Sequence, residues 1–235
     1  MECRTEGVFI ITGGAGAIAG AIARVFLEAG ARVVLADLPE SSVARRAVEL
    51  GAQAVEADLG TLGGAERMVA ETAGLFGQVD GLIHTAGGFA MTAAHRADMV
   101  HFDLMLDVNL RTLFCAVRAV LPELLARRSG FLAGISSSVV LTGGGAGMAV
   151  YAAAKGAVSA YLRAVEAEVG KEGIHVAVVY PFGPVDTPRN RAEMPGVDPK
   201  LWVDPEEIGH ALLFAATRSP RGRLLQLEIR PPAER

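Results

Sequence analysis

The chain has 235 residues, of which 51% are hydrophobic and 20% charged, and its formal net charge is -4 at pH 7. This composition is typical of a globular protein with a sizeable core and excludes an intrinsically disordered chain. The small negative charge gives no reason to expect a nucleic acid as partner. The length and even composition predict a single domain over residues 1–235.

The two cysteines, Cys3 and Cys115, lack any metal-binding or redox spacing, so we expect reduced thiols, no metal and a cytoplasmic protein. The N-terminus lacks the basic start and continuous apolar core of a secretory signal. Residues 129–154 carry no charge, but serines and glycines interrupt them, which favours a buried strand and a loop over a membrane span. Little lysine beside arginine, with much alanine, is typical of a bacterium with GC-rich DNA.

Apolar runs and helical periodicities alternate along the chain. Runs rich in β-branched and aliphatic residues predict strands at residues 8–12, 32–36, 81–85, 130–136, 175–180 and 223–229. Segments with helical composition or spacing predict helices at residues 17–29, 62–76, 101–126, 151–172 and 205–217. This alternation predicts an α/β fold with a doubly wound parallel sheet, whose ligands bind beyond the carboxyl ends of the strands.

A glycine-rich segment, residues 12–20, follows the first predicted strand and leads into a helix. Glycines allow a tight turn, and the N–H groups and dipole of the helix can receive a pyrophosphate. A plain strand-to-helix turn is the alternative, but the position at the first turn of the sheet favours a dinucleotide. We expect Gly13, Gly16 and Ile18 to contact it.

Two aspartates follow the next strand-like segments. Asp37 lies about twenty residues after the glycines, where a carboxylate can accept hydrogen bonds from an adenosine ribose and repel a 2′-phosphate. NAD(H) is therefore favoured, and NADP(H) is not excluded; a turn aspartate before Pro39 is the alternative interpretation. Asp58, followed by Leu59, either caps a helix or lies beside the adenine, and the sequence favours neither.

Tyr151 and Lys155 lie four residues apart in a predicted helix and so share one face. A free tyrosine ionises near a pKa of about 10, and a neighbouring ammonium favours the phenolate. We therefore expect Lys155 to lower the pKa of Tyr151. Ser138, thirteen residues before Tyr151 at the end of a predicted strand, is placed to hydrogen-bond a substrate carbonyl. Each residue alone has an ordinary structural explanation, and their joint arrangement predicts acid–base chemistry.

These motifs together resemble the short-chain dehydrogenase/reductase family over residues 8–229. The resemblance implies a Rossmann-type fold and hydride transfer between a nicotinamide and a carbonyl or carbinol carbon. It implies that Ser138, Tyr151 and Lys155 are catalytic, that Tyr151 passes the proton and that Lys155 also holds the nicotinamide ribose. Asn109 resembles the asparagine that holds a water connecting the lysine to solvent.

Further cofactor contacts follow from the same resemblance. Ala86 and Gly87 resemble the family's segment beside the adenosine, and Pro181 with Thr187 resembles the stretch that holds the nicotinamide carboxamide. The resemblance also implies a homodimer or homotetramer, formed through the helices around residues 104–126 and 151–169. Apolar helices of this kind can equally pack inside one subunit.

The chain departs from the family pattern at several positions. The second and third glycines of the family fall on Ala17 and Ala19, so the phosphates would meet two additional methyl groups. His84 and Thr85 stand where the family has Asn-Asn, and Phe182 is an insertion after Pro181. We interpret His84 as a strand-end residue rather than a catalyst.

A narrower resemblance, to quinonoid dihydropteridine reductases, is carried by residues 86–90 and by residues 186–191 continuing to Met194, Pro195 and Trp202. Those reductases have the Tyr-x-x-x-Lys pair but lack the serine. Because this chain has Ser138, carbonyl or alcohol chemistry is favoured.

The leading hypothesis is an NAD(H)-preferring alcohol dehydrogenase or carbonyl reductase. The alternatives are an NADH-dependent dihydropteridine reductase and a dinucleotide-binding sensor without turnover. We expect a small-molecule substrate, enclosed by residues 88–94, 140–148 and a short loop at about 187–204. Arg189 and Arg191 in that loop are candidates for binding an anionic group.

Overall fold

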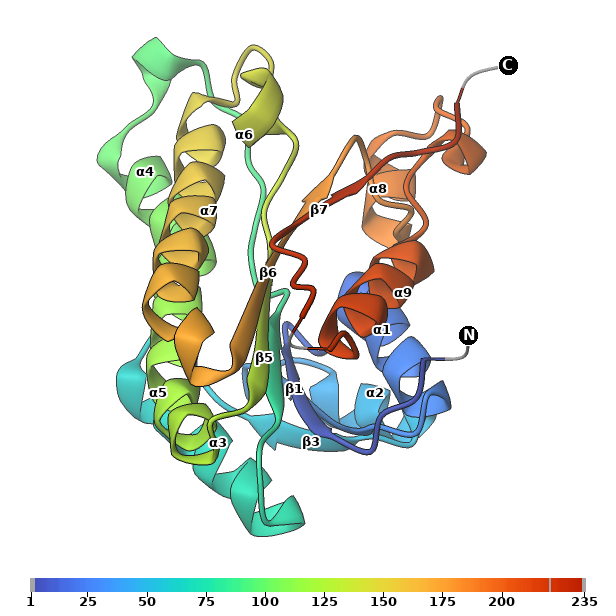
Figure 1. Ribbon diagram of the computed structural model, residues 1–235. Helices are drawn as coiled ribbons and strands as arrows, with labels where there is room; N and C mark the ends of the chain where they lie inside the picture. Colours follow the sequence, from blue (N-terminus) through green and yellow to red (C-terminus); the bar gives the residue numbers. More distant parts are fainter. Residues whose placement is uncertain (1–2, 220, 234–235) are drawn as a thin grey trace.

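The computed structural model describes residues 3–219 and 221–233 (Figure 1). Its strands are β1 (Val8–Thr12), β2 (Arg32–Asp37), β3 (Gln53–Glu56), β4 (Gly81–His84), β5 (Gly130–Ile135), β6 (Ile174–Pro181) and β7 (Gln226–Ile229). Its helices are α1 (Ala17–Glu28), α2 (Val43–Leu50), α3 (Leu62–Phe76), α4 (Met99–Leu106), α5 (Thr112–Arg127), α6 (Val139–Thr142), α7 (Ala149–Val169), α8 (Pro188–Glu193) and α9 (Pro205–Ala216).

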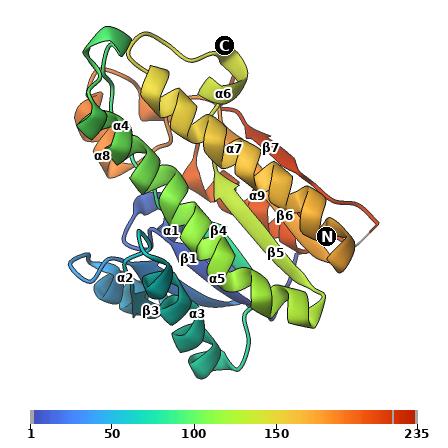
Figure 2. The same ribbon diagram turned by 90° about the vertical axis from the view of Figure 1, so that its left-hand side faces the viewer.

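The strands form one parallel sheet in the order β3-β2-β1-β4-β5-β6-β7. Helices cover both faces: α3, α5 and α7 lie on one, seen toward the viewer in Figure 2, and α1, α2 and α9 lie on the other. The predicted α/β fold with a doubly wound parallel sheet in a single domain is therefore confirmed. Its strand order reverses direction beside β1, where such sheets bind their ligands.

The hydrophobic core has two layers because successive side chains of a strand point to opposite faces. Ile10 and Leu82 pack against the α3, α5 and α7 layer, while their neighbours Ile11 and Ile83 pack against the α1 and α9 layer. All five residues of β1 are buried. Burial on both faces explains why the central strands are continuous apolar runs in the sequence.

Some elements differ from the prediction. The expected helix at residues 101–126 is divided into α4 and α5 by a π-helical turn, Asp107–Arg111. The closing strand begins at Gln226 rather than at residue 223. The sequence analysis did not predict β3 or α2. β3 is an edge strand with exposed Gln53 and Glu56, so it is not a continuous apolar run. α2 buries only two side chains, so its helical periodicity is weak. Residues 130–148 form β5 followed by α6 and a loop, as expected for that uncharged stretch.

Among the described residues, no helix combines the length and apolar character needed to span a membrane.

Candidate active site

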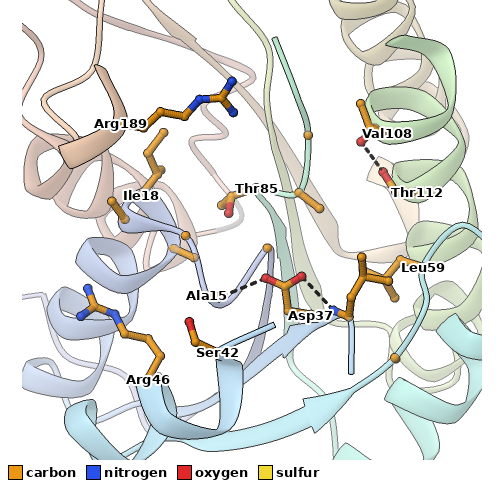
Figure 3. Close-up of a pocket in the computed structure, with 18 of the residues that line it drawn as sticks. Ala15, Ile18, Asp37, Ser42, Arg46, Leu59, Thr85, Val108, Thr112 and Arg189 are labelled. Atoms are coloured by element: carbon orange, nitrogen blue, oxygen red, sulfur yellow. Dashed lines mark hydrogen bonds between the residues drawn. The ribbon is translucent and has the colours of Figure 1, made fainter. Parts of the chain in front are cut away.

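A cavity of about 850 Å³ lies at the carboxyl ends of β1, β2 and β4 (Figure 3). This volume falls in the range of small-molecule and cofactor sites. Nine of the residues expected to bind the cofactor line the cavity: Gly13, Gly16, Ile18, Asp37, Asp58, Leu59, Ala86, Gly87 and Thr187. The structure therefore gathers residues that are up to 174 positions apart in the sequence, from Gly13 to Thr187, around one space.

The glycine-rich loop forms the floor of this cavity. Gly13 has φ +67°, and a Cβ there would lie 2.9 Å from the Ala86 nitrogen, so a side chain at this position would be strained and crowded. Gly16 precedes α1 and supplies no side-chain cap to it, which leaves N–H groups of the first helical turn available for an anion. Ala19 is fully buried in the core, and Ala17 lines the cavity without closing it. The loop therefore fits a dinucleotide.

Asp37 connects the end of β2 to this loop. One carboxylate oxygen accepts a hydrogen bond from the Ala15 nitrogen at 2.9 Å and the other from the Leu38 nitrogen at 2.8 Å (Figure 3). A carboxylate oxygen can accept more than one hydrogen bond, so Asp37 keeps acceptor capacity toward the cavity. Asp37 therefore stabilises the turn after β2, and it also lines the cavity, where its carboxylate can accept hydrogen bonds from a ribose.

Asp58 also has a structural role beside the cavity. Its carboxylate accepts a hydrogen bond from the Gly60 nitrogen at 2.8 Å. The cap of α3 is Thr61, whose hydroxyl accepts from the Gly64 nitrogen at 3.1 Å. Asp58 therefore forms the turn before α3, is not its cap, and together with Leu59 borders the cavity.

Lys155 lies buried on α7, with its amine donating a hydrogen bond to the Ile135 carbonyl at 2.9 Å. The Ser136 hydroxyl lies 3.0 Å from the Lys155 carbonyl and 2.7 Å from the Ser159 hydroxyl, so these serines join the end of β5 to α7. Burial lowers the pKa of the Lys155 ammonium to about 8. The lysine is therefore a fixed cation that loses its proton more readily than a solvated one.

The side chain of Ser137 lies close enough to the Tyr151 hydroxyl to affect its pKa. Burial raises the pKa of Tyr151, and the Ser137 side chain opposes that increase in part. The expected lowering of this pKa by Lys155 is not found. Lys155 donates to Ile135 instead.

The contacts of Ser138 are made by its main chain. Its nitrogen donates to the Pro181 carbonyl at 3.2 Å, and its own carbonyl accepts from the Thr142 hydroxyl at 3.0 Å. These contacts place Ser138 at the start of α6 and beside the end of β6. Ser137 and Ser138 both lie at the end of β5 just before α6, and Ser137 is the one that affects the pKa of Tyr151.

Asn109 lies in the π-helical turn between α4 and α5. Its amide oxygen accepts from the Gly88 nitrogen at 3.2 Å, and its amide nitrogen donates to the carbonyls of Gly88 at 3.1 Å and Met105 at 2.9 Å. The side chain therefore fixes the chain after β4. A Cβ on Gly87 would lie 2.7 Å from the Asn109 oxygen and 3.3 Å from the Lys155 amine, so Asn109 and Lys155 lie directly behind this cavity-lining residue.

His84 is a buried site residue whose role the sequence did not reveal. Its Nδ1 lies 2.9 Å from the Thr12 hydroxyl and its Nε2 lies 3.2 Å from the Thr112 hydroxyl. Because Thr112 donates its proton to the Val108 carbonyl, at 2.9 Å, Nε2 is assigned as the protonated nitrogen and Nδ1 as the acceptor. Burial and the Lys155 charge lower the pKa of His84 to about 3, so the ring is neutral.

Of the other residues expected to bind the cofactor, Pro181, Tyr151 and Lys155 do not line the cavity, whereas Thr187 borders it on the α8 side. Pro181 ends β6, and Thr187 caps α8 by accepting from the Asn190 nitrogen at 3.2 Å. Arg189 pairs with Glu193 at 2.8 Å, and Arg191 pairs with both oxygens of Asp186. These ion pairs occupy the two arginines that were candidates for an anionic substrate group.

Comparisons with known proteins agree with this arrangement. A family profile described as short chain dehydrogenase matches residues 7–197. An uncharacterized oxidoreductase of Staphylococcus saprophyticus is 30% identical over 95% of this chain and 97% of its own, and one of Staphylococcus aureus strain MW2 is 29% identical over 98% and 100%. The crystal structure of gox2181 superposes with a TM-score of 0.86 at 25% identity, over 97% of this chain and 96% of that one. The chain belongs to the short-chain dehydrogenase family of oxidoreductases.

Proposed function

We propose that this protein is an NAD(H)-preferring oxidoreductase that interconverts a carbonyl compound and its alcohol, with Tyr151 as the acid–base residue. The observation that carries this proposal is the position of Tyr151 on α7, one helical turn from the buried Lys155, which donates to the Ile135 carbonyl at the end of β5. Lys155 lies close to the cavity, because a Cβ on the lining residue Gly87 would be 3.3 Å from its amine, although neither Lys155 nor Tyr151 is among the lining residues.

Different residues in and beside the cavity bind different parts of the cofactor. The first turn of α1 binds the pyrophosphate, and Asp37 accepts hydrogen bonds from the adenosine ribose. Thr187 and Pro181 lie where the nicotinamide end is held. A nicotinamide cofactor supplies the hydride for reduction or accepts it for oxidation.

The protein's own chemistry is proton transfer. In the reducing direction the Tyr151 O–H bond breaks and its proton passes to the substrate oxygen, while the hydride forms the new C–H bond. The raised pKa keeps Tyr151 protonated at neutral pH, which suits a proton donor. The Ser137 hydroxyl stabilises the oxygen as charge develops on it, and the Lys155 ammonium, one helical turn from Tyr151, contributes positive charge at this end of the site.

Cofactor preference rests on the balance of charges around the adenosine end. The Asp37 carboxylate disfavours a 2′-phosphate, whereas Arg45 and Arg46 border the same end of the cavity. Arg46 lies 3.3 Å from Glu49, which partly neutralises it. The proposal therefore favours NAD(H), and we expect weaker binding of NADP(H).

The proposal is tested by titrating wild type and Asp37→Ala with NADH and NADPH while following nicotinamide fluorescence, and then by assaying carbonyl reduction with Tyr151→Phe. We expect NADH to bind more tightly than NADPH, and Asp37→Ala to reduce that preference. Tyr151→Phe should bind NADH normally and lose turnover by about 10²-fold or more. Turnover of quinonoid dihydropterins instead of carbonyl compounds would support the reductase alternative, and cofactor binding without any turnover would support the sensor alternative.

The proposal extends to a homodimer or homotetramer. Apolar side chains are exposed on α4 and α5, among them Met99, Val100 and Phe114. The Phe114 ring lies 6.0 Å from that of Tyr161 on α7, so the two helices present a continuous surface. Light scattering should give a dimer or tetramer, and Phe114→Glu should shift it toward the monomer.

A further inference from the structure

Phe89 lies directly against the tyrosine. The centroids of the Phe89 and Tyr151 rings are 4.8 Å apart and the ring planes are inclined at 89°, an edge-to-face contact. Phe89 is 39% exposed, whereas Tyr151 is largely enclosed. Phe89 therefore covers one side of the tyrosine and keeps part of its own ring open to an incoming molecule.

The position of Phe89 is held from both sides. On one side Gly88 exchanges two hydrogen bonds with Asn109, at 3.2 and 3.1 Å. On the other, the Thr92 nitrogen donates to the Gly147 carbonyl at 2.9 Å, which joins this segment to the loop before α7. Because Phe89 lies between these two attachments, its ring stays beside Tyr151 although the segment is neither helix nor strand.

Apolar side chains of the Phe89 segment and of the loop before α7 lie near one another. The Met91 methyl group would lie 3.4 Å from a Cβ on Gly147, and a Cβ on Gly144 would lie 3.3 Å from Val139 and 3.7 Å from Met148. We call Phe89, Met91, Val139 and Met148 the apolar rim. Methionine side chains are flexible and adapt to ligands of different shape.

The apolar rim carries no charge. Residues 85–94 and 129–154 contain no Asp, Glu, Lys or Arg, and the nearby arginines of α8 are paired with acidic residues. An anionic substituent placed against the rim would lose its hydration without gaining a partner, which is unfavourable. An apolar substituent would lose water and gain packing.

We propose that Phe89 is a specificity-determining residue, and that it selects neutral carbonyl compounds bearing an apolar ring beside the carbonyl over small aliphatic or anionic ones. This inference rests on the proposed function, because a carbonyl oxygen hydrogen-bonded to Tyr151 places its neighbouring substituent against Phe89. The Phe89 ring then contacts the substituent directly, while the proton transfer itself stays with Tyr151.

The test compares reduction of benzaldehyde, 4-carboxybenzaldehyde and propanal by wild type, Phe89→Ala and Phe89→Leu. Wild type should prefer benzaldehyde. Phe89→Ala should lower kcat/KM for benzaldehyde about tenfold, chiefly through KM, and leave propanal and the NADH Kd nearly unchanged. Phe102→Ala is the matched control, since Phe102 on α4 is also 39% exposed, and it should leave kcat/KM unchanged for all three aldehydes.

A second measurement needs no turnover. Because Phe89 helps to enclose Tyr151, Phe89→Ala should lower the pKa of that tyrosine, seen as phenolate absorbance that is missing when Tyr151→Phe is added. An equal loss with all three aldehydes, or an unchanged benzaldehyde preference in Phe89→Ala, would overturn the proposal even though carbonyl reduction stands. Absence of aldehyde reduction by wild type that binds NADH would instead overturn the proposed function and this inference with it.

Discussion

His84 and Thr12 connect the ends of two neighbouring parallel strands inside the core. The ring nitrogen Nδ1 of His84, on β4, lies 2.9 Å from the hydroxyl of Thr12, the last residue of β1. The same hydroxyl accepts hydrogen bonds from the nitrogens of Thr85 at 3.2 Å and Ala86 at 3.3 Å. A neutral imidazole therefore fixes the turn after β4 against the glycine-rich loop.

This histidine makes the stability of the protein depend on pH. The pKa of His84 is lowered to about 3 by burial and by Lys155, whereas an unfolded histidine has a pKa of about 6.5. Between these values the unfolded chain binds a proton that the folded one does not, so stability falls as pH falls from about 6.5 toward 3. The slope attributable to His84 is at most about 1.4 kcal/mol per pH unit, and above about pH 6.5 it vanishes.

Urea unfolding at about pH 7 and about pH 5 measures this effect. His84→Asn, which cannot titrate, should lose less stability between the two pH values than wild type does. His95→Asn serves as the control, because that histidine is exposed. If His84→Asn and wild type lost the same amount, the pH dependence would have to come from other groups.

The serine that assists Tyr151 can be identified by substitution. Ser137→Ala removes the hydroxyl that affects the pKa of Tyr151 and should lower kcat for carbonyl reduction on the order of a hundredfold, as loss of a donor to a developing oxyanion does. Ser138→Ala should change kcat by no more than a few-fold, because the contacts of Ser138 are made by its main chain. NADH affinity should be unchanged in both. A larger loss of kcat in Ser138→Ala than in Ser137→Ala would instead support Ser138 as the catalytic serine.

The sheet was predictable where burial and sequence coincide. β1, β2 and β4 are apolar runs because both faces of the central sheet are covered, and the sequence shows this directly. β3 is buried at a single position, Val55, so its residues resemble those of a loop. The π-helical turn, Asp107–Arg111, keeps helical composition and changes only the hydrogen-bond pattern, which composition does not encode.

The candidate site was predictable where the chemistry is carried by unique residue types. Tyr151 and Lys155 have a recognisable spacing of four residues, and Asp37 follows the glycine-rich segment by about twenty residues. In the structure Asp37 lines the cavity. The serine was ambiguous because residues 136–138 are three serines in succession, and each has a different role: joining helix to strand, affecting the pKa of Tyr151, or beginning α6. The role of His84 depends on hydroxyl partners from two distant segments, which no local pattern reveals.

Gly13 should be intolerant of any side chain. At φ +67° an L-residue is strained by about 1–3 kcal/mol, and its Cβ would crowd the Ala86 nitrogen at 2.9 Å. Gly13→Ala should therefore destabilise the protein and weaken NADH binding. Gly74→Ala is the matched control: it lies in α3 with nothing within 4 Å of the added methyl group and should stabilise the protein by about 0.5–1 kcal/mol. Normal NADH affinity in Gly13→Ala would contradict the prediction that the turn at Gly13 forms part of the cofactor site.

Lys155 should set the alkaline limit of carbonyl reduction. Burial lowers the pKa of its ammonium to about 8, whereas burial raises the pKa of Tyr151, so the lysine is the first of the two to lose its proton as pH rises. We expect kcat/KM for reduction to decline above about pH 8, approaching tenfold per pH unit. The arginine of Lys155→Arg keeps its charge at higher pH. We expect this variant to be slower than wild type, but its kcat/KM should not decline above about pH 8. Measuring the NADH Kd at each pH separates this decline in kcat/KM from weaker binding of the cofactor. If the decline persisted unchanged in Lys155→Arg, the titrating group would not be the lysine, and the charge of Lys155 would have no part in proton transfer by Tyr151.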